Sequence, residues 1–437
     1  MSMKTNLAGH RGPAVSADPH LAGWADSGDP TLALGSGLRG KRVGMVVFSS
    51  YPADPRPRRA VEALLKEGMT VDLICEGEEK SPKREILDRL EIIRIPIRHR
   101  RGGALSYAYQ YSAFILIAAA ILAWRSLRSR YDLVYVHNMP DILVLTALLP
   151  KLFGAKVILD QHDPMPELMR TIFHMDEKSF GVRVIRRLEK WSIARANLVI
   201  TVNVACKRIF SSRSCPPEKI GVVMNSPDEE IFPFQTEPLR ASLTQAPKRR
   251  FVIMYHGSLV ERNGVDLAVD AISLVREAIP TAELRIYGRK TPFLERVMEQ
   301  VRSEGLESNV QYLGPRSLEQ LVLEIEDCDV GVIPNHRNAF TEINTPTRIF
   351  EYLAMGKPVI APSTPGILDY FTEDSLLLVE PGNSADIARQ IEYVARNYQD
   401  AIRVAERGQQ IYLQHTWKQE RRTLVELVGG LLSRAEA

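Results

Sequence analysis

The chain has 437 residues, and its 56 lysines and arginines nearly balance 53 aspartates and glutamates. A hydrophobic fraction of 45% excludes a disordered chain, and the formal net charge of +3 argues against nucleic acid as a partner, which requires a basic excess. The four cysteines lack CxxC spacing and are typical of reduced cytoplasmic thiols, so neither a zinc site nor a disulfide framework is predicted.

Residues 1–40 are predicted to be a disordered lead-in. They are rich in glycine, alanine, serine, aspartate and proline, and they contain no apolar stretch of the length found in signal peptides. The segment from Gly35 to Gly40 matches GxGxxG but precedes an apolar run. A dinucleotide-binding loop follows a strand, so no dinucleotide is assigned to it.

From residue 41, short runs of β-branched and aliphatic residues alternate with longer helical stretches. Strands are expected at 43–48, 71–75, 91–95, 133–137, 156–159 and 198–201. Strands that alternate with helices in this way predict βαβ units and a parallel sheet, so residues 41–238 are expected to form a first α/β domain.

Prolines between residues 227 and 247 mark a linker, after which the same pattern restarts. Strands are expected at 251–255, 284–287, 310–313, 329–333, 358–361 and 376–379. Residues 248–412 are therefore predicted to form a second α/β domain. Residues 413–437 contain an amphipathic helix at 417–432 that no strand follows.

Residues 102–124 carry no charge, are long enough to span a bilayer, and are flanked by seven arginines. A membrane span is rejected because the segment lies between two strands of one sheet. Two interpretations stay open. The segment is a buried helix of the first domain, or residues 94–130 form a partly exposed helix that contacts an anionic membrane face. The second would make the protein peripheral on the cytoplasmic side of the plasma membrane.

The strongest motif is a short helix in the second domain. Thr345 is a good N-cap, Pro346 suits the first helical position, and Gly356 suits the position after the helix end. The helix follows a strand and a loop, so its N-terminus is expected at the carboxyl edge of the sheet, where ligands bind in open α/β folds.

This helix carries groups that suit a nucleotide. Its free N–H groups, from Thr347 onward, and its dipole favour a phosphate, and Arg348 adds a guanidinium. Glu351, nearly two turns in, is placed to accept paired hydroxyls of a ribose or sugar. At the start of the same domain, a strand is followed by Gly257, Ser258 and Arg262, where the backbone and a cation can approach a diphosphate.

Candidate polar groups of the first domain lie at strand ends. His162 and Asp163 follow one predicted strand, and His137 ends the preceding one, so both histidines are expected at the same edge of the sheet. Arg56, at the start of the first helix, is expected to face either an anionic acceptor or solvent. No metal site is assigned, because the DxD motif at residues 327–329 begins a strand instead of ending one.

Four segments together resemble glycosyltransferase family 4, the retaining nucleotide-sugar transferases of GT-B fold. They run from Ser50 to Arg56, Asp160 to Asp163, His256 to Gly264 and Phe350 to Ile360. The resemblance covers about residues 41–435. It implies two facing Rossmann-like, doubly wound domains and a C-terminal helix that crosses back to the first domain.

The resemblance also implies roles. Glu351 matches the second glutamate of the E-x7-E motif, which holds the nucleotide ribose, and His162 matches the histidine near the donor sugar. The first glutamate of that motif falls on Ile343, with Glu342 one residue away, so either the loop is shifted by one residue or the sugar contact is altered. The phosphate-binding arginine and lysine of the family fall on Ser258 and Asn263 in this sequence. Neither residue is basic, so Arg262 and Arg348 are expected to replace them.

The predicted function is retaining transfer of a hexose-type sugar from a UDP- or GDP-linked donor. The acceptor is a saccharide or a lipid-linked molecule of bacterial surface polysaccharide or glycolipid biosynthesis, and no metal or further cofactor is expected. The departures from the family motifs leave two alternatives. These are a nucleotide-sugar epimerase of the same fold and an inactive scaffold or binding subunit.

Overall fold

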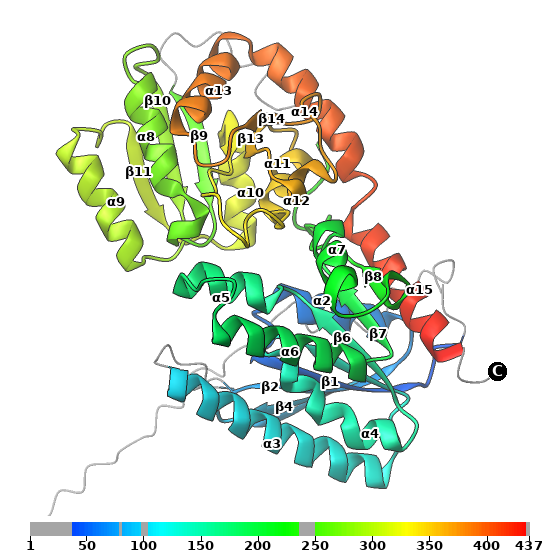
Figure 1. The fold of residues 1–437 in the computed structure, drawn as a ribbon. Coiled ribbons are helices and arrows are strands. Elements are labelled where there is room, and N and C mark those ends of the chain that lie inside the picture. Colours follow the sequence, from blue (N-terminus) through cyan, green and yellow to red (C-terminus); the bar gives the residue numbers. More distant parts are fainter. Residues whose placement is uncertain (1–36, 78–80, 98–103, 236–249, 434–437) are drawn as a thin grey trace, which may run out of the picture.

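The computed structural model describes residues 37–77, 81–97, 104–235 and 250–433, and these form two α/β domains joined near residues 235–250 (Figure 1). Residues 1–36 of the predicted lead-in and most of the predicted linker lie outside the described residues. The prediction of disorder is wrong for residues 37–40, because Leu38 is buried in the first domain's core and the Gly40 N–H donates to the Gly68 carbonyl at 3.0 Å. Each domain is built around one sheet with helices on both faces, as the alternating sequence pattern predicts.

The sheet of the first domain has eight strands in the order β3-β4-β2-β1-β5-β6-β7-β8. All neighbouring pairs are parallel except β3 and β4. The central strands are buried on both faces, which explains their continuous apolar runs. Their bounds are β1 Arg42–Ser50, β2 Thr70–Glu76, β3 Arg84–Leu87, β4 Leu90–Ile95, β5 Leu133–His137, β6 Lys156–Gln161, β7 Leu198–Thr201 and β8 Ile220–Val222.

Two layers of helices cover this sheet. One face is covered by α3 (Ala104–Arg128), the 3₁₀ helix η2 (Asp141–Ala147), α4 (Leu148–Leu152), α6 (Phe180–Arg195) and α7 (Val204–Arg213), which share one apolar cluster with the strands. The other face is covered by α2 (Pro55–Lys66) and α15 (Trp417–Ser433). Helix α5 (Met165–Phe173) and the short η3 (Pro217–Lys219) complete the domain.

The second domain has six parallel strands in the order β11-β10-β9-β12-β13-β14. The strands are β9 Phe251–His256, β10 Ala282–Tyr287, β11 Val310–Gly314, β12 Val330–Val332, β13 Val359–Pro362 and β14 Leu377–Val379. The helices are η5 Glu261–Asn263, α8 Val265–Val275, α9 Pro292–Ser303, α10 Leu318–Asp327, α11 Thr347–Ala354, α12 Pro365–Leu368, α13 Ser384–Arg396 and α14 Tyr398–Tyr412.

The sequence prediction missed two strands. β3 alternates exposed and half-buried residues at the sheet edge, and β8 has only three residues, so neither forms the continuous apolar run by which the others were predicted. Helix α2 begins at Pro55, so Arg56 lies at its start as predicted, and the Asp54 side chain caps it by accepting a hydrogen bond from the Arg56 N–H.

Helix α15 crosses back to the first domain, as predicted from the family resemblance (Figure 1). Leu424 and Val428 are buried in the same apolar cluster as α2 and β1. The Glu420 carboxylate accepts a hydrogen bond of 2.7 Å from the Met224 N–H, and Arg421 pairs with Glu67 at 2.7 Å. The C-terminal helix is therefore part of the first domain's core.

Helix α3 is buried on one face only. Phe114, Ile115, Ala118 and Leu122 pack against the sheet, whereas much of the opposite face is exposed. Within the described residues, Tyr109–Arg128 is the one helical stretch long and apolar enough to cross a membrane by length and composition. The buried face lies in the domain core, in agreement with the rejection of a membrane span.

Replacing Leu424 by alanine tests the role of α15. Leu424 is buried against the first domain, so we expect Leu424→Ala to lower the free energy of unfolding by about 2–5 kcal/mol through lost burial and the cavity left behind. Urea denaturation measures the change. Leu323→Ala, at an exposed leucine of α10, serves as the control and is expected to stay within about 0.5 kcal/mol of the wild type. Equal effects of both variants would contradict the docking of α15.

Candidate active site at the sheet edges

The candidate site lies at the carboxyl edges of the two sheets. In each sheet the chain reverses its direction of strand addition at one point, between β1 and β5 in the first domain and between β9 and β12 in the second. Loops diverge at such switch points, and ligands of open α/β sheets bind there. His137 ends β5 and His256 ends β9, so chemistry-bearing side chains stand at both switch points.

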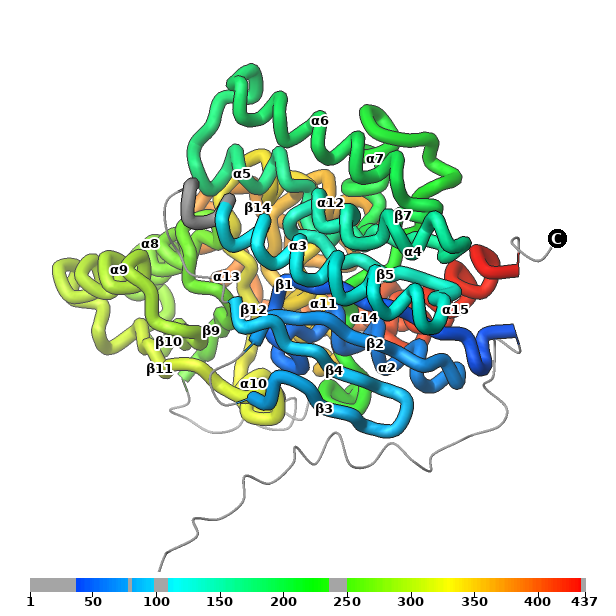
Figure 2. Tube along the Cα trace, turned by 90° about the horizontal axis from the view of Figure 1, so that it is seen from below, coloured from blue at the N-terminus to red at the C-terminus, as the bar shows by residue number. Residues whose placement is uncertain are grey.

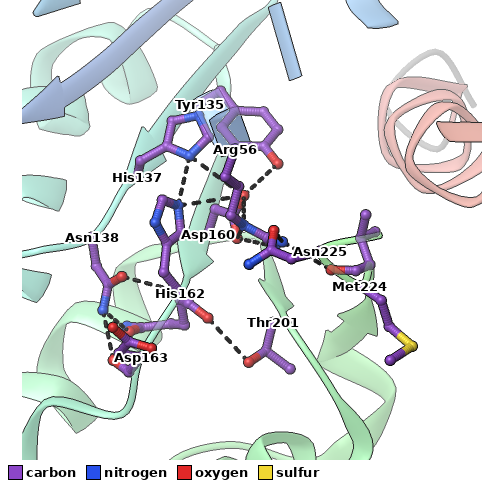
Figure 3. Close-up of polar contacts among 12 residues, drawn as sticks. Arg56, Tyr135, His137, Asn138, Asp160, His162, Asp163, Thr201, Met224 and Asn225 are labelled. Carbon is purple, nitrogen blue, oxygen red and sulfur yellow. Dashed lines mark hydrogen bonds and ion pairs between the residues drawn. The ribbon is translucent and has the colours of Figure 1, made fainter. Parts of the chain in front are cut away.

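A buried ion pair organises the first domain's edge (Figure 3). The Arg56 guanidinium donates to the Asp160 carboxylate at 2.6 and 3.0 Å, and also to the carbonyl of Val223 and the side chain of Asn225, both at 2.9 Å. The Tyr135 hydroxyl donates to Asp160 at 2.9 Å. The expectation that Arg56 faces an acceptor or solvent is wrong, because the carboxylate at the end of β6 binds its guanidinium inside the domain.

Two neutral histidines lie next to the Asp160 carboxylate, His137 at 3.4 Å and His162 at 3.9 Å (Figure 3). His137 Nδ1 and His162 Nε2 are 2.9 Å apart, so one ring donates and the other accepts. Burial lowers the pKa of His137 to about 4 and places the pKa of His162 well below its usual value. Arg56 holds the pKa of Asp160 at about 2 in spite of burial, so at neutral pH a carboxylate lies beneath two uncharged imidazoles.

Asn138 fixes the loop that carries His162 and Asp163. Its side-chain oxygen accepts a hydrogen bond of 2.8 Å from the His162 N–H, and its amide donates to the Asp163 carbonyl at 3.0 Å and to Gln161 at 2.7 Å. The sequence prediction missed Asn138, although it directly follows the strand-end His137. One amide side chain thus orients the two residues that the sequence singled out.

His137, Asp160 and His162 are also the kind of residues that ligate metals. Their ligand atoms lie within 4.8 Å of one another. Both carboxylate oxygens of Asp160 already accept hydrogen bonds, from Arg56 and Tyr135. A cation at this place would have to compete with the Arg56 guanidinium, so the donor set fits a proton-sharing cluster better than a metal centre.

In the second domain, α11 begins one residue later than predicted. Its first helical residue is Thr347 and its N-cap is Pro346, so the prediction of Thr345 as N-cap is wrong. The Thr345 hydroxyl instead donates to the Gly366 carbonyl at 2.7 Å and accepts from Asn203 of the first domain at 3.1 Å. No side chain caps the start of α11, which leaves its N–H groups available to an anion.

Gly257 and Arg348 meet directly beside the end of β9. Gly257 has φ of 128°, a conformation that favours glycine, and a Cβ there would lie 3.3 Å from the Arg348 side chain. The Arg348 guanidinium donates to the His256 carbonyl at 2.8 Å and lies 4.7 Å from the Tyr255 ring centre. The contact places the Arg348 guanidinium next to the backbone of Gly257, which has no side chain to block a ligand. A diphosphate can therefore approach both the backbone and the cation.

Glu351 completes this group from the next turn of α11. Its carboxylate oxygen lies 3.3 Å from His256 Nε2. Burial raises the pKa of Glu351 to about 7, although Arg348 and Arg59 act in the opposite direction, and burial lowers the pKa of His256 to about 3. Arg59 is a buried residue of α2, so the second domain's glutamate lies within the electrostatic field of a first-domain cation.

Asp163 and Arg262 connect the two domains electrostatically. Burial raises the pKa of Asp163 to about 6, and Arg262 is the strongest influence that lowers it. Arg262 lies on η5, and its guanidinium is 5.6 Å from the Phe340 ring centre. Arg262, for which a diphosphate contact is predicted, therefore lies in the second domain close to Asp163 of the first domain.

Two positions at which the chain departs from the family motifs, Ser258 and Ile343, have different surroundings. Ser258 is exposed, and its carbonyl accepts hydrogen bonds from Tyr255 and Asn263, so its carbonyl is engaged within the loop. Ile343, which takes the place of the family's first glutamate, packs against the first domain's apolar cluster, and its carbonyl accepts from Asn203 at 2.8 Å. Ile343 thus contributes an apolar contact with the first domain.

Two facing Rossmann-like domains, with a polar group at each sheet edge, define a glycosyltransferase of GT-B fold. Residues 58–230 match the family model described as Glycosyltransferase Family 4, and residues 250–397 match the model described as Glycosyl transferases group 1. The chain belongs to the family 4 glycosyltransferases and is a transferase.

Known relatives agree with this assignment. The probable glycosyltransferase WbjE of Pseudomonas aeruginosa is 22% identical over 58% of this chain and 61% of its own length. The D-inositol 3-phosphate glycosyltransferase of Corynebacterium urealyticum is 27% identical over 86% of this chain and 89% of its own length. This chain thus spans about three fifths of WbjE and most of the second relative.

Solved structures share the fold. Sucrose-phosphate synthase from Thermosynechococcus elongatus superposes with a TM-score of 0.73 at 17% identity, over 90% of this chain and 100% of that chain. HepE of Anabaena in complex with UDP superposes with a TM-score of 0.67 at 18% identity, over 89% of this chain and 100% of that chain. At these identities the likeness shows the fold, and both structures support the GT-B architecture.

Removing the charge of Asp160 tests the buried ion pair. Asp160→Asn leaves Arg56 buried without its carboxylate, so we expect the free energy of unfolding at pH 7 to fall by about 3–5 kcal/mol. Glu295→Gln, which removes one partner of the exposed Lys290–Glu295 pair, serves as the control and is expected to cost less than about 1 kcal/mol.

The pH dependence of the same variant gives a second readout. The folded-state pKa of Asp160 is about 2, below its unfolded value of about 3.9, so its stabilisation is fully present above pH 4 and is lost as pH falls toward 2. The free energy of unfolding of Asp160→Asn is therefore expected to depend less steeply on pH between 4 and 2 than that of the wild type. Parallel pH curves would contradict the ion pair.

Proposed function

We propose that the protein transfers a hexose-type sugar, with retention of anomeric configuration, from a UDP- or GDP-linked donor to a saccharide or lipid-linked acceptor. The observation that supports this most strongly is the group formed by Gly257, Arg348 and Glu351 at the carboxyl edge of the second sheet. It combines an uncapped helix start, a close backbone approach, a guanidinium and a carboxylate.

The donor's nucleotide is expected on the second domain. A diphosphate fits between the backbone at Gly257 and the N–H groups that begin at Thr347, and Arg348 offsets its charge. Glu351 can then accept both ribose hydroxyls when it is ionised. HepE of Anabaena has been solved in complex with UDP and in complex with UDP-glucose, which supports a nucleotide-linked hexose here.

The donor sugar is expected to face the first domain at His162 and Asp163. The neutral His162 can hydrogen-bond a sugar hydroxyl without adding charge, and Asp163 stands near Arg262 from the opposite domain. As the sugar–phosphate bond breaks, negative charge develops on the leaving diphosphate, and Arg262, Arg348 and the start of α11 stabilise it. The leaving phosphate oxygen on the same face of the sugar takes the acceptor proton, which yields retention.

The proposal includes no metal ion and no further cofactor, because two guanidiniums and a helix start supply the positive charge that a divalent cation would supply. It also includes a place in bacterial surface polysaccharide or glycolipid biosynthesis. One relative, WbjE, is a probable glycosyltransferase, and another is a D-inositol 3-phosphate glycosyltransferase, which supports an acceptor that carries several hydroxyl groups.

Glu351→Gln tests the donor site. A nucleoside diphosphate at about 100 times its dissociation constant stabilises a protein by about 2.7 kcal/mol, and each 1 kcal/mol shifts the melting temperature of a domain of about 150–250 residues by about 2–4 °C. We therefore expect UDP or GDP to raise the melting temperature of the wild-type second domain by about 5–11 °C and Glu351→Gln to lose most of that shift. Glu299→Gln, at an exposed glutamate of α9, is the control and should keep the shift. An undiminished shift in Glu351→Gln would contradict the ribose contact.

The affinity for an intact nucleotide sugar is expected to depend on pH through Glu351. Its pKa is about 7 in the free protein, and only the carboxylate accepts two hydroxyls, so the affinity should rise from pH 6 to pH 8. Titration calorimetry with UDP-glucose measures this, because its phosphodiester groups do not titrate in that range. The Glu351→Gln variant should show a flat profile, and a slope equal to that of the wild type would assign the titration to another group.

Product analysis tests the reaction itself. We expect a transferred hexose that keeps the donor's anomeric configuration, detected by proton NMR, and a rate unchanged by a chelator at millimolar concentration. An inverted product would contradict the retaining mechanism, and chelator inhibition reversed by a divalent cation would contradict metal independence. A free epimerised nucleotide sugar would favour the epimerase alternative, and donor binding without turnover would favour the scaffold.

A further inference from the structure

The outer side of the first domain's α3 layer is a surface that the glycosyltransferase reaction does not use. Figure 2 views the molecule from the side on which α3 lies and shows α3 between the sheet edge and the neighbouring helices α4 and α6. Helix α3 packs on η2 and α4, and α6 packs on η2, so these elements form one continuous layer. We refer to its solvent side as the α3–α6 face.

The middle of the α3–α6 face is apolar. Along α3, the exposed side chains recur at helical spacing over about 27 Å. Leu116 and Leu127 are each 70% exposed and Trp124 is 53% exposed, while Leu152 at the end of α4 is 80% exposed. Half-buried apolar side chains continue the surface along η2 and α4, namely Ile142, Leu145, Leu148 and Leu149. Single exposed leucines are ordinary on a soluble protein, but a continuous patch of them marks an interaction site.

The rim of the α3–α6 face is basic. Its exposed charged side chains are Arg128, Arg130, Arg183, Arg187, Lys190 and Arg195. The one carboxylate of α6, Glu189, is buried and pairs with Arg213. Helix α3 contains no acidic residue. The nearest exposed carboxylates in the chain, Asp176 and Glu177, belong to the connection before α6, and Glu177 pairs with Arg170 and Arg186.

Aromatic residues lie between the apolar middle and the basic rim. The Arg128 guanidinium lies 3.6 Å from the Trp124 ring centre, and Arg195 lies 5.0 Å from that of Trp191. A cavity of about 430 Å³ opens beside Trp124 and Arg128 and is also lined by Arg42, Arg84 and Arg125, with Glu91 as its carboxylate. Aromatic rings next to arginines are typical of surfaces that rest at the level of lipid headgroups.

We propose that the α3–α6 face docks on an anionic bilayer, with its leucines inserted at the headgroup boundary and its arginines and lysine on lipid phosphates. The positive charge of the rim favours an anionic bilayer over a second copy of the chain, because a second copy would bring one basic rim against another. Helix α3 lies on the surface and does not span, because Phe114, Ile115 and Leu122 on its other side belong to the domain core. The cytoplasmic leaflet of the plasma membrane carries the required negative charge.

This inference goes beyond the proposed function and does not depend on it, because vesicle binding requires no donor. The test is co-sedimentation of the full chain with phosphatidylcholine vesicles that contain 0–40% phosphatidylglycerol. We expect binding to rise with the anionic fraction and to fall at least tenfold as ionic strength increases from about 0.05 to 0.5 M, because salt screens the attraction.

Two double variants locate the surface. Leu116→Glu/Leu127→Glu and Arg187→Glu/Lys190→Glu change only exposed residues and are each expected to weaken vesicle binding at least tenfold. The matched controls lie on the second domain: Leu323→Glu at an exposed leucine, and Arg302→Glu/Arg396→Glu at exposed arginines. All variants should keep the wild-type melting temperature and the UDP- or GDP-induced shift, which separates lost docking from lost folding or lost donor binding.

Several outcomes would overturn the proposal. These are no binding to anionic vesicles at low salt, or binding that both double variants retain. Binding that resists high salt and alkaline washing would indicate a spanning helix instead. A stable dimer in ultracentrifugation that Leu116→Glu/Leu127→Glu dissociates, without vesicle binding, would assign the face to a second copy of the chain.

Discussion

The buried ion pair between Arg56 and Asp160 is the interaction on which the first domain's functional edge depends. Its guanidinium joins α2 to β6 and to the segment at Val223 and Asn225, so three parts of the chain that are far apart in sequence meet at one charge. The same cation keeps Asp160 ionised in the interior. It also opposes protonation of the histidines above it, and together with burial this outweighs the attraction of the carboxylate. The candidate sugar-facing His162 is therefore a neutral hydrogen-bonding group, chiefly because burial lowers its pKa and in addition because Arg56 opposes its protonation.

The second domain has the same type of sheet edge but a different electrostatic arrangement. There the buried ionisable group is the Glu351 carboxyl, and its neighbour His256 remains neutral. Without a close ion pair to offset the effect of burial, the pKa of Glu351 is raised. Arg348 is engaged with the His256 carbonyl, and Arg59 acts from the other domain. The carboxylate is thus left ready for an incoming partner with hydroxyl groups. Switch points of parallel sheets bring these two contrasting sites to edges that face each other across the domain contact.

The sequence predicted the parts of this structure that depend on local pattern. Twelve of the fourteen strands produce apolar runs that could be assigned, and Glu351, Arg348 and Gly257 form one group as expected from the helix and loop that carry them. It failed where the decisive partner is distant. Arg56 looks like a surface residue until Asp160, 104 residues later, is placed beside it, and Thr345 looks like a cap until Asn203 of the other domain binds it. Asn138 was missed although it directly follows a strand-end histidine, because its partners, Gln161, His162 and Asp163, lie more than twenty residues further along the chain.

The first domain's sheet must be covered on both faces, and the two covers differ in a way that folding alone does not explain. On one face α2 and the returning α15 use their apolar side chains inward, and polar contacts such as Arg421 with Glu67 hold their flanks. On the other face α3 buries Phe114, Ile115, Ala118 and Leu122, which already complete the core. The leucines on its outer side add nothing to that core, and exposing them to water stabilises no part of the domain. Their regular spacing beside a basic, carboxylate-poor rim is accounted for by a surface outside the protein and not by the packing within it.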